Sequence, residues 1–519
     1  MVCVTNKIQK YKKRTLQTIS VLLLLLLMIP CVTCFAEAEG PKPSLEELNT
    51  GKIGVVTGSA YEQFAKDTFK EAEIKYFTGG SEMIMGLQQN KIDAFLADSL
   101  WYAAMCWDLD TLKRYDDNIS SLDCAFALSD EALKSGLLDQ VNAFITESKK
   151  NGLLDKLNKK WVGDAEPQEC PDLTKLPNVN GKIKVAVSAY SRPLAYMKDN
   201  RAYGMNVELL YAFAEEYGYA IDVDIIGFEA ILPGIAAGKY DIAASQIAIT
   251  EERKQVLNFS DPYIKNEVIA VYYQDAKQEG NFFGNLMNSL EKTFIKEQRW
   301  LMILNGIKIT MIITLCALIL GLALGFGLYM LRRKFGKPII NFMKVYTRIL
   351  SGTPMVVILM ILYYIIFASG NISGTIVAIV GFSLTCCSFV YSNLTVAVDS
   401  VSPGQREAAL ASGFTENATF FNVVLPQAMK IFLPAFQGEA VALCKSTAIV
   451  GYVTVQDLTK ATDIIRGNTY EAFFPLITTA IIYFLLTWAI AGVIGTAISK
   501  ADTKRRTKKE ILKGVKNDD

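Results

Sequence analysis

The 519-residue chain contains no histidine. Histidine is the side chain that titrates near neutral pH, and its absence excludes a Ser-His-Asp triad, a phosphorylatable histidine and the commonest zinc ligand. We therefore expect a protein that is not an enzyme, binds no metal and holds no cofactor of its own. A sensor kinase is disfavoured for the same reason.

Disulfide frameworks and nucleotide-binding loops are also missing. Outside the leader and the apolar runs only Cys106, Cys124 and Cys170 remain, and three cysteines form at most one bridge. Each Gly-Lys pair is followed by Ile, Tyr or Pro, so the phosphate loop Gly-x-x-x-x-Gly-Lys-Ser/Thr does not occur. If ATP drives this protein, a separate polypeptide must hydrolyse it.

The charges balance at +1, yet 51% of the residues are hydrophobic and the mean hydropathy is +0.24. A chain this long and this apolar contains more than one domain and lies partly in a lipid bilayer. Basic residues crowd the tail at 500–519. We expect this tail in the cytoplasm, and we expect no nucleic-acid partner.

Residues 1–38 have the pattern of a secretory signal peptide. Basic residues precede the apolar run 19–29, and the small residues Ala36 and Ala38 follow it. The pattern predicts that the next domain is exported. Cleavage of the signal is favoured, and an uncleaved anchor helix is the alternative.

Strand and helix patterns alternate over residues 45–165 and again over 180–275, within a domain expected at 39–275. A Pro-containing connector separates the two stretches. The expected strands are 52–57, 92–97, 182–187, 221–226, 240–245 and 268–273. The expected helices are 61–69, 129–161, 206–217 and 228–237.

A polar connector at 276–300 leads to a membrane region at 301–499. Several of its apolar segments exceed the ~20 residues that cross a bilayer. A further helix, 338–350, is expected along the inner surface. With the exported domain outside, five crossings place the basic tail in the cytoplasm. The five segments are 302–331, 355–368, 375–398, 431–455 and 473–498.

A polar segment at 402–430 interrupts these apolar runs. Ser402 can cap a helix that begins at Pro403, and Gly413 can end that helix in a left-handed conformation. A second helix is expected to stop at Pro426. The pattern predicts a docking loop, and an ordinary amphipathic hairpin is the alternative.

This segment resembles the signature loop of ABC importer permeases, although an Ile is usual where Val423 stands. The resemblance implies that the loop docks an ATPase subunit, which uses the ATP. It also implies a homodimeric or paired permease in a bacterial cell membrane. The residues that carry the resemblance are Glu407, Ala408, Ala409, Gly413, Leu425 and Pro426.

The two α/β stretches resemble the bilobed solute-binding proteins of polar amino-acid importers, but in swapped order. Residues 180–275 carry the family's first half, through 204–209, 238–241, 249–254 and 259–263. Residues 45–165 carry the second half, through 54–59, 91–98 and 151–157. The resemblance implies an α/β type II periplasmic-binding-protein-like domain, circularly permuted at its hinge. An all-α permease domain of about five transmembrane helices would follow.

The resemblance also implies a site for an amino acid. Arg253 would bind the α-carboxylate, because a guanidinium presents two parallel donors to two carboxylate oxygens. Asp98 would bind the α-ammonium, Ser59 would add a hydroxyl and backbone N–H groups at a helix start, and Phe228 would form an aromatic wall. The remaining ligand-binding positions are Ala60, Ser188, Ser245 and Gln246.

The chain is thus expected to be the substrate-binding and membrane-spanning subunit of an ATP-driven importer for amino acids, in particular polar ones. Glu439 and Lys445 are ionisable residues at membrane depth and are candidates to line the translocation path. Lys445 pairing across a subunit interface is the alternative.

An amino-acid-gated ion channel or receptor is the second hypothesis for the whole chain. Residues 450–452, Val-Gly-Tyr, match part of a potassium-channel filter. A filter needs a second Gly, whereas Val453 follows Tyr452, so the importer is favoured.

Overall fold

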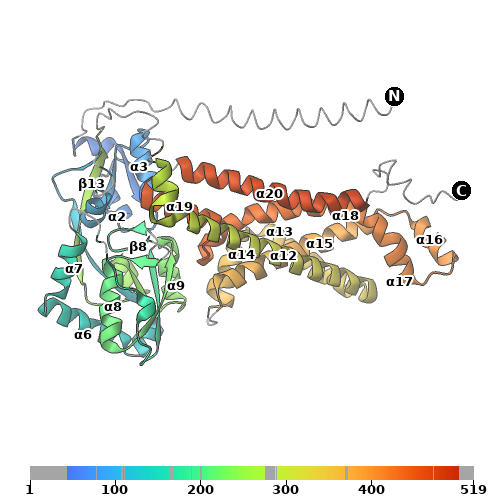
Figure 1. The fold of residues 1–519 in the computed structure, drawn as a ribbon, viewed down its shortest axis with the longest axis horizontal. Helices are drawn as coiled ribbons and strands as arrows, with labels where there is room; N and C mark the ends of the chain where they lie inside the picture. Colours follow the sequence, from blue (N-terminus) through green and yellow to red (C-terminus); the bar gives the residue numbers. More distant parts are fainter. Residues whose placement is uncertain are drawn as a thin grey trace.

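An α/β region and a bundle of long helices lie end to end in the computed structural model (Figure 1). The structure describes residues 44–501 except 78, 107–108, 110, 163–166, 168, 189, 199–200, 275–286, 288, 369–371 and 471–472. The predicted signal peptide, residues 276–286 and 288 of the predicted connector, and the tail beyond 501 lie outside the described residues. The seven described cysteines are all free.

The α/β region is built on a single ten-stranded sheet in the order β10-β6-β11-β5-β13-β3-β1-β2, with β12 beside β5 and β4 beside β13. Its central strands are buried on both faces and are nearly continuous apolar runs, as expected for strands covered by helices. The strands are β1 (Lys52–Val56), β2 (Glu73–Phe77), β3 (Ala94–Asp98), β4 (Leu112–Arg114), β5 (Ser120–Leu128), β6 (Lys182–Ser188), β10 (Ala220–Ile226), β11 (Ile242–Ala248), β12 (Asn258–Phe259) and β13 (Ile264–Tyr273).

Two strands join the lobes. One lobe contains β1, β2 and β3, and the other contains β6, β10 and β11. Strand β5 comes from the first half of the chain but pairs antiparallel with β11, with Ala127 opposite Ala243. Strand β13 comes from the second half but pairs with β3, with Ile269 opposite Ala97. The predicted bilobed fold is confirmed, although the sequence reading omitted β5.

Three helices of the first half pack on the lobe of the second half. They are α5 (Asp130–Lys134), α6 (Leu137–Lys150) and α7 (Leu153–Trp161), where one helical stretch at 129–161 was predicted. Gly136 and Gly152, both at φ +78°, break that stretch because glycine readily adopts left-handed backbone. Trp161 is fully buried and donates a hydrogen bond of 2.8 Å to Glu208 in α8 (Met205–Tyr217). The lobe boundary therefore does not coincide with the division of the chain near residue 165.

Within the described residues, the membrane region contains four helices that are long and apolar enough to cross a bilayer. A fifth span is formed if α13 (Lys337–Gly352) and the following helix α14 (Met355–Ile361), bent by 106° at the break, count as one. The prediction of about five segments is therefore confirmed. The four long helices are α12 (Arg299–Phe335), α15 (Gly374–Asp399), α18 (Leu425–Ser446) and α20 (Phe473–Ala501).

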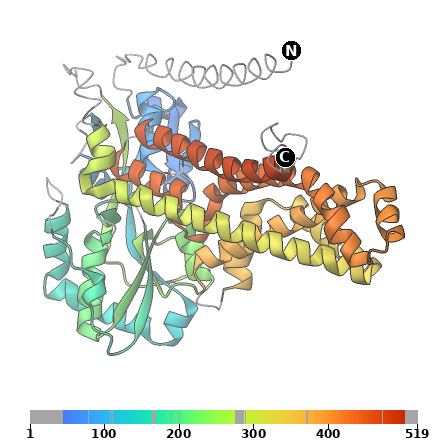
Figure 2. The ribbon, with the colours of Figure 1, turned by 45° about the vertical axis from the view of Figure 1, so that its right-hand side comes forward.

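Glycines allow α12 and α15 to approach closely along much of their length (Figure 2). A Cβ at Gly321 would lie 2.5 Å from Cβ of Cys386, and a Cβ at Gly325 would lie 2.7 Å from Cβ of Val390. Small residues at such contacts are typical of helices that pack within lipid. By contrast, only 6% of the most apolar 18-residue stretch of α20 is buried, so most of its surface is open to lipid or to another subunit.

Both lobes contact the membrane region. Helix α19 (Leu458–Thr469) holds Arg466, which pairs with Glu82 of the first lobe at 3.1 Å. Asn468, near the end of α19, donates a hydrogen bond of 2.7 Å to the carbonyl of Met197 in the other lobe. Lys239 in that lobe donates one of 3.0 Å to the carbonyl of Phe367. The binding region therefore rests on the helices through both of its lobes.

We predict that residues 45–275 unfold as one unit, because β5 and β13 each complete the lobe that the other half of the chain builds. Calorimetry on this fragment should show one cooperative transition, and fragments 45–165 and 180–275 should each fail to fold alone. Two independent transitions would indicate tandem domains instead.

Candidate functional site

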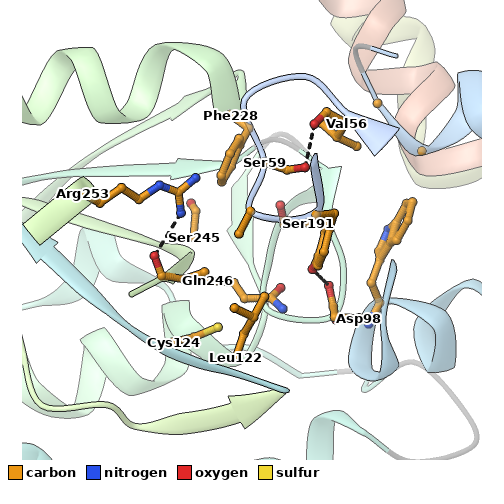
Figure 3. A pocket seen from close by; sticks show the side chains of 16 residues that line it. Val56, Ser59, Asp98, Leu122, Cys124, Ser191, Phe228, Ser245, Gln246 and Arg253 are labelled. Carbon is orange, nitrogen blue, oxygen red and sulfur yellow. Dashed lines mark hydrogen bonds between the residues drawn. The ribbon is translucent and has the colours of Figure 1, made fainter. Parts of the chain in front are cut away.

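A cavity of about 100 Å³ lies between the two lobes (Figure 3). The first lobe contributes the segments around Ser59 and Asp98. The other contributes Phe228, Gln246 and Arg253. Because its walls come from both lobes, the cavity would be closed or opened by relative movement of the lobes.

Asp98 stands at the end of β3, where it caps helix α4 (Ser99–Met105). Its Oδ1 accepts a hydrogen bond of 2.7 Å from the Trp101 backbone N–H, and its Oδ2 accepts one of 2.8 Å from the Tyr61 hydroxyl. Burial, followed by the adjacent Asp98 carboxylate, raises the pKa of Tyr61 well above its usual value. Tyr61 therefore stays a neutral donor that holds the carboxylate toward the cavity.

Arg253 extends into the cavity from α10 (Glu251–Lys254), whose start is capped by Thr250. Its Nη1 donates 3.0 Å to the carbonyl of Ala248, and its Nη2 donates 3.1 Å to the carbonyl of Gly58 in the opposite lobe. Burial lowers the pKa of Arg253, but a guanidinium remains protonated at any physiological pH. The side chain thus brings a fixed positive charge to the junction of the lobes.

Ser59 lies in the turn before α2 (Tyr61–Thr68). Its hydroxyl donates a hydrogen bond of 2.6 Å to the carbonyl of Val56, so the hydroxyl proton is already used. The backbone N–H groups at the start of α2, from Ala60 onward, have no acceptor within the helix. At this position the donors for an anion are therefore backbone groups rather than the predicted hydroxyl.

Four further predicted positions are placed by the structure. Phe228, at the start of α9 (Phe228–Ala236), lines the cavity, as do Ser245 and Gln246 on β11. Gln246 has φ +56°, at a register shift of β11 against β5. Ser188 is fully buried and does not line the cavity, because its backbone N–H donates to the hydroxyl of Ser245 and places it behind that residue.

The sequence reading missed part of the wall. Trp101, Leu122 and Cys124 also line the cavity. Gly80 is needed beside them, since a Cβ there would lie 1.9 Å from the Trp101 ring. The spacing of Trp101, three residues after the strand-end Asp98, was a usable signal. By contrast, Leu122 and Cys124 belong to β5, which was not predicted.

The polar segment forms an exposed projection at the end of the bundle far from the lobes (Figure 1). It consists of α16 (Pro403–Ala411), a turn with Gly413 at φ +88°, and α17 (Glu416–Thr419). Arg406 and Glu416 join the two helices through a 2.6 Å ion pair. Glu407 is exposed and makes no hydrogen bond or ion pair with the described residues.

Two details of this segment differ from the prediction. The side chain of Ser402 makes no capping hydrogen bond, and Pro403 at the first helical position sets the backbone conformation of the helix start. Pro426 does not stop the second helix. A π-helical turn at 420–424 runs directly into α18, and Pro426 occupies its first turn, where a missing N–H is tolerated.

The membrane-depth residues both lie on α18, with Glu439 half-buried and Lys445 exposed. Neither forms an ion pair with another described residue. Residues 450–452 belong to a 3₁₀ helix, and the carbonyls of Val450 and Gly451 accept backbone hydrogen bonds. Carbonyls engaged in this way do not form a filter, so nothing in this segment favours the channel hypothesis.

A lobed α/β region over a transmembrane bundle defines a class, a binding protein joined to a permease. The chain belongs to the bacterial extracellular solute-binding proteins, family 3, whose model matches residues 183–509, and to the family of amino-acid ABC transporter permeases. The expected resemblance, fold class and function are therefore confirmed.

Several similar proteins each match part of this chain. The chain is 32% identical over 200 residues to the arginine transport system permease protein ArtQ of Bacillus subtilis. The matched stretch covers 38% of this chain and 91% of ArtQ. It is 31% identical over 198 residues to the putative glutamine transport system permease protein GlnP of Rickettsia felis, covering 37% and 89%. A crystal structure of an amino acid ABC transporter with histidines is 26% identical, with a TM-score of 0.37, and covers 43% of this chain and all of that one.

We predict that Arg253→Lys and Asp98→Asn each weaken amino-acid binding by about 2–5 kcal/mol. Asn leaves the buried α-ammonium without a counter-charge, and Lys keeps the charge but cannot present two parallel donors to the two carboxylate oxygens. Titration calorimetry on the purified chain measures this. The control is Arg201→Lys, which changes an exposed Arg paired with Asp172 outside the cavity. Affinities within threefold of the unmodified protein would refute the site.

Proposed function

We propose that this chain captures an amino acid between its lobes and passes it through its own helices, with a separate ATPase supplying the energy. The observation that carries the proposal is one cavity faced by a single carboxylate, Asp98, and a single guanidinium, Arg253, from opposite lobes. These charges complement the α-ammonium and α-carboxylate that every amino acid carries. The names of the relatives, which refer to arginine and glutamine transport, support this ligand class.

The projection at 402–424 is the proposed ATPase-docking surface. Glu407 and Ala408 are exposed on α16, and the apolar side chains of Phe414 and Phe421 are exposed beside them. Exposed apolar groups next to charged ones are typical of protein contacts. Arg333 of α12 lies over the Phe420 ring at 3.8 Å and ties the projection to the bundle. This link gives ATPase movement a direct route to a transmembrane helix.

We propose that the projection faces the cytoplasm and the lobes face outward. Several basic residues stand at the projection end of α12 and at the start of α13, which supports this orientation. They are Arg332, Arg333, Lys334 and Lys337. The exposed face of α20 and the exposed Lys445 support pairing with a second permease copy. In such a pair Glu439 would line the path between the subunits.

The two halves of the binding region are proposed to be one solute-binding domain, circularly permuted. Support comes from the exchange of β5 and β13 and from the single cavity that both halves line. In this arrangement residues 180–275 correspond to the family's first half and residues 45–165 to its second.

Calorimetry on the full-length chain in detergent tests the ligand class. We expect one amino acid bound per chain, and neither inorganic phosphate nor a sugar should compete. Binding of one of those in place of every amino acid would contradict the proposal.

Gly413→Val should abolish co-purification of the ATPase and ATP-driven uptake while amino-acid binding survives. No atom lies within 4 Å of a Cβ at Gly413, so the cost comes from φ +88° alone, on the order of 1 kcal/mol or more for a branched side chain. The control is Gly336→Val, with φ +67° and equally open space, between α12 and α13. Undiminished ATPase association in the Gly413 variant would remove the docking assignment.

A further inference from the structure

The cavity is poor in charge. Among the described residues that line it, Asp98 and Arg253 are the only two with a formal charge. The other polar lining residues are neutral, because their groups are hydroxyls, an amide and a thiol. They are Ser59, Tyr61, Ser191, Ser245, Gln246 and Cys124.

Two acidic residues next to lining positions lie outside the cavity. Asp123 is exposed and lies between Leu122 and Cys124 on β5, so its side chain is on the opposite face of the strand from the two that line the cavity. Glu252 precedes Arg253 on α10 and is also exposed. Neither carboxylate lines the cavity, so neither neutralises a cation inside it.

Resting on the proposed function, we infer that the bound amino acid has an uncharged side chain. Its α-carboxylate and α-ammonium consume the two cavity charges. A third charge, as in arginine, lysine, glutamate or aspartate, would be buried without a counter-charge, and an unpaired buried charge is strongly penalised. The cavity therefore rejects charged side chains because its lining offers no further counter-charge.

Two neutral polar groups are free to contact the ligand side chain. The Gln246 amide makes no hydrogen bond with another described residue, and the Ser191 hydroxyl makes none either. An amide both donates and accepts, so it can bind an amide or hydroxyl of either polarity. Trp101, Phe228 and Leu122 supply the apolar walls. The site thus fits a neutral side chain of modest size.

The test is titration calorimetry on the full-length protein in detergent with L-glutamine, L-serine, L-methionine, L-arginine, L-lysine and L-glutamate. We expect the tightest neutral amino acid to bind more than tenfold tighter than any charged one. A charged amino acid that binds within tenfold of the best neutral one would overturn this inference and leave the proposed function standing. If none of the six binds, the remaining standard amino acids are titrated in the same way, and if none of them binds either, the proposed function itself fails and this inference fails with it.

The variant Gln246→Glu adds a carboxylate of nearly the same shape to the cavity. It should raise the affinity for arginine relative to the best neutral amino acid at least tenfold. Because both ligands share Arg253 and Asp98, the ratio is insensitive to any disturbance of those two residues. The matched control is Gln255→Glu, the same change at an exposed position outside the cavity, which should leave the ratio unchanged. An unchanged ratio in Gln246→Glu would overturn the placement of the side chain beside Gln246.

Discussion

The exchange of β5 and β13 between the lobes is the constraint on which the binding region depends. Each strand pairs with the sheet of the lobe built by the other half of the chain. Neither lobe is therefore a complete folding unit, and among the described residues β5 and β13 are the strands exchanged between the lobes. The cavity lies beside these segments, since Leu122 and Cys124 of β5 form part of its wall.

The charges of the cavity follow from local sequence. Asp98 ends a buried strand and caps the next helix, and Arg253 sits in a short helix capped by Thr250. Both positions are element ends, where backbone geometry brings a side chain to the sheet edge. Hydrogen bonds with the Tyr61 hydroxyl and with the carbonyls of Gly58 and Ala248 hold the two charged groups in place. Such preorganisation lowers the entropic cost of binding.

The sequence predicted the order of the domains and the charged site residues better than the remaining residues of the cavity wall. Strand ends such as Asp98, the left-handed Gly413 and the apolar helices carry local signals, so each was predictable. Strand β5 was missed, although residues 120–128 pack as a nearly continuous buried run. Ser188 was expected in the site from the family resemblance, yet the hydrogen bond from its backbone N–H to the hydroxyl of Ser245 sets it behind the cavity wall. The contact between the Trp101 ring and Gly80 depends on tertiary packing, and no local sequence pattern reveals this contact.

The contacts of both lobes with the membrane helices have a consequence for transport kinetics. A receptor that diffuses freely must find its permease. Here the ion pair between Arg466 and Glu82 and the hydrogen bond from Asn468 to the carbonyl of Met197 already join the lobes to the helices. Covalent tethering keeps the local concentration of the receptor high and independent of its expression level. Thermodynamic coupling between two sites is reciprocal. If a permease state that shifts α19 changes the affinity for the amino acid by a given factor, binding of the amino acid changes the population ratio of that state by the same factor. The amino-acid affinity of the lobes thus depends on the conformation of the membrane helices that they contact.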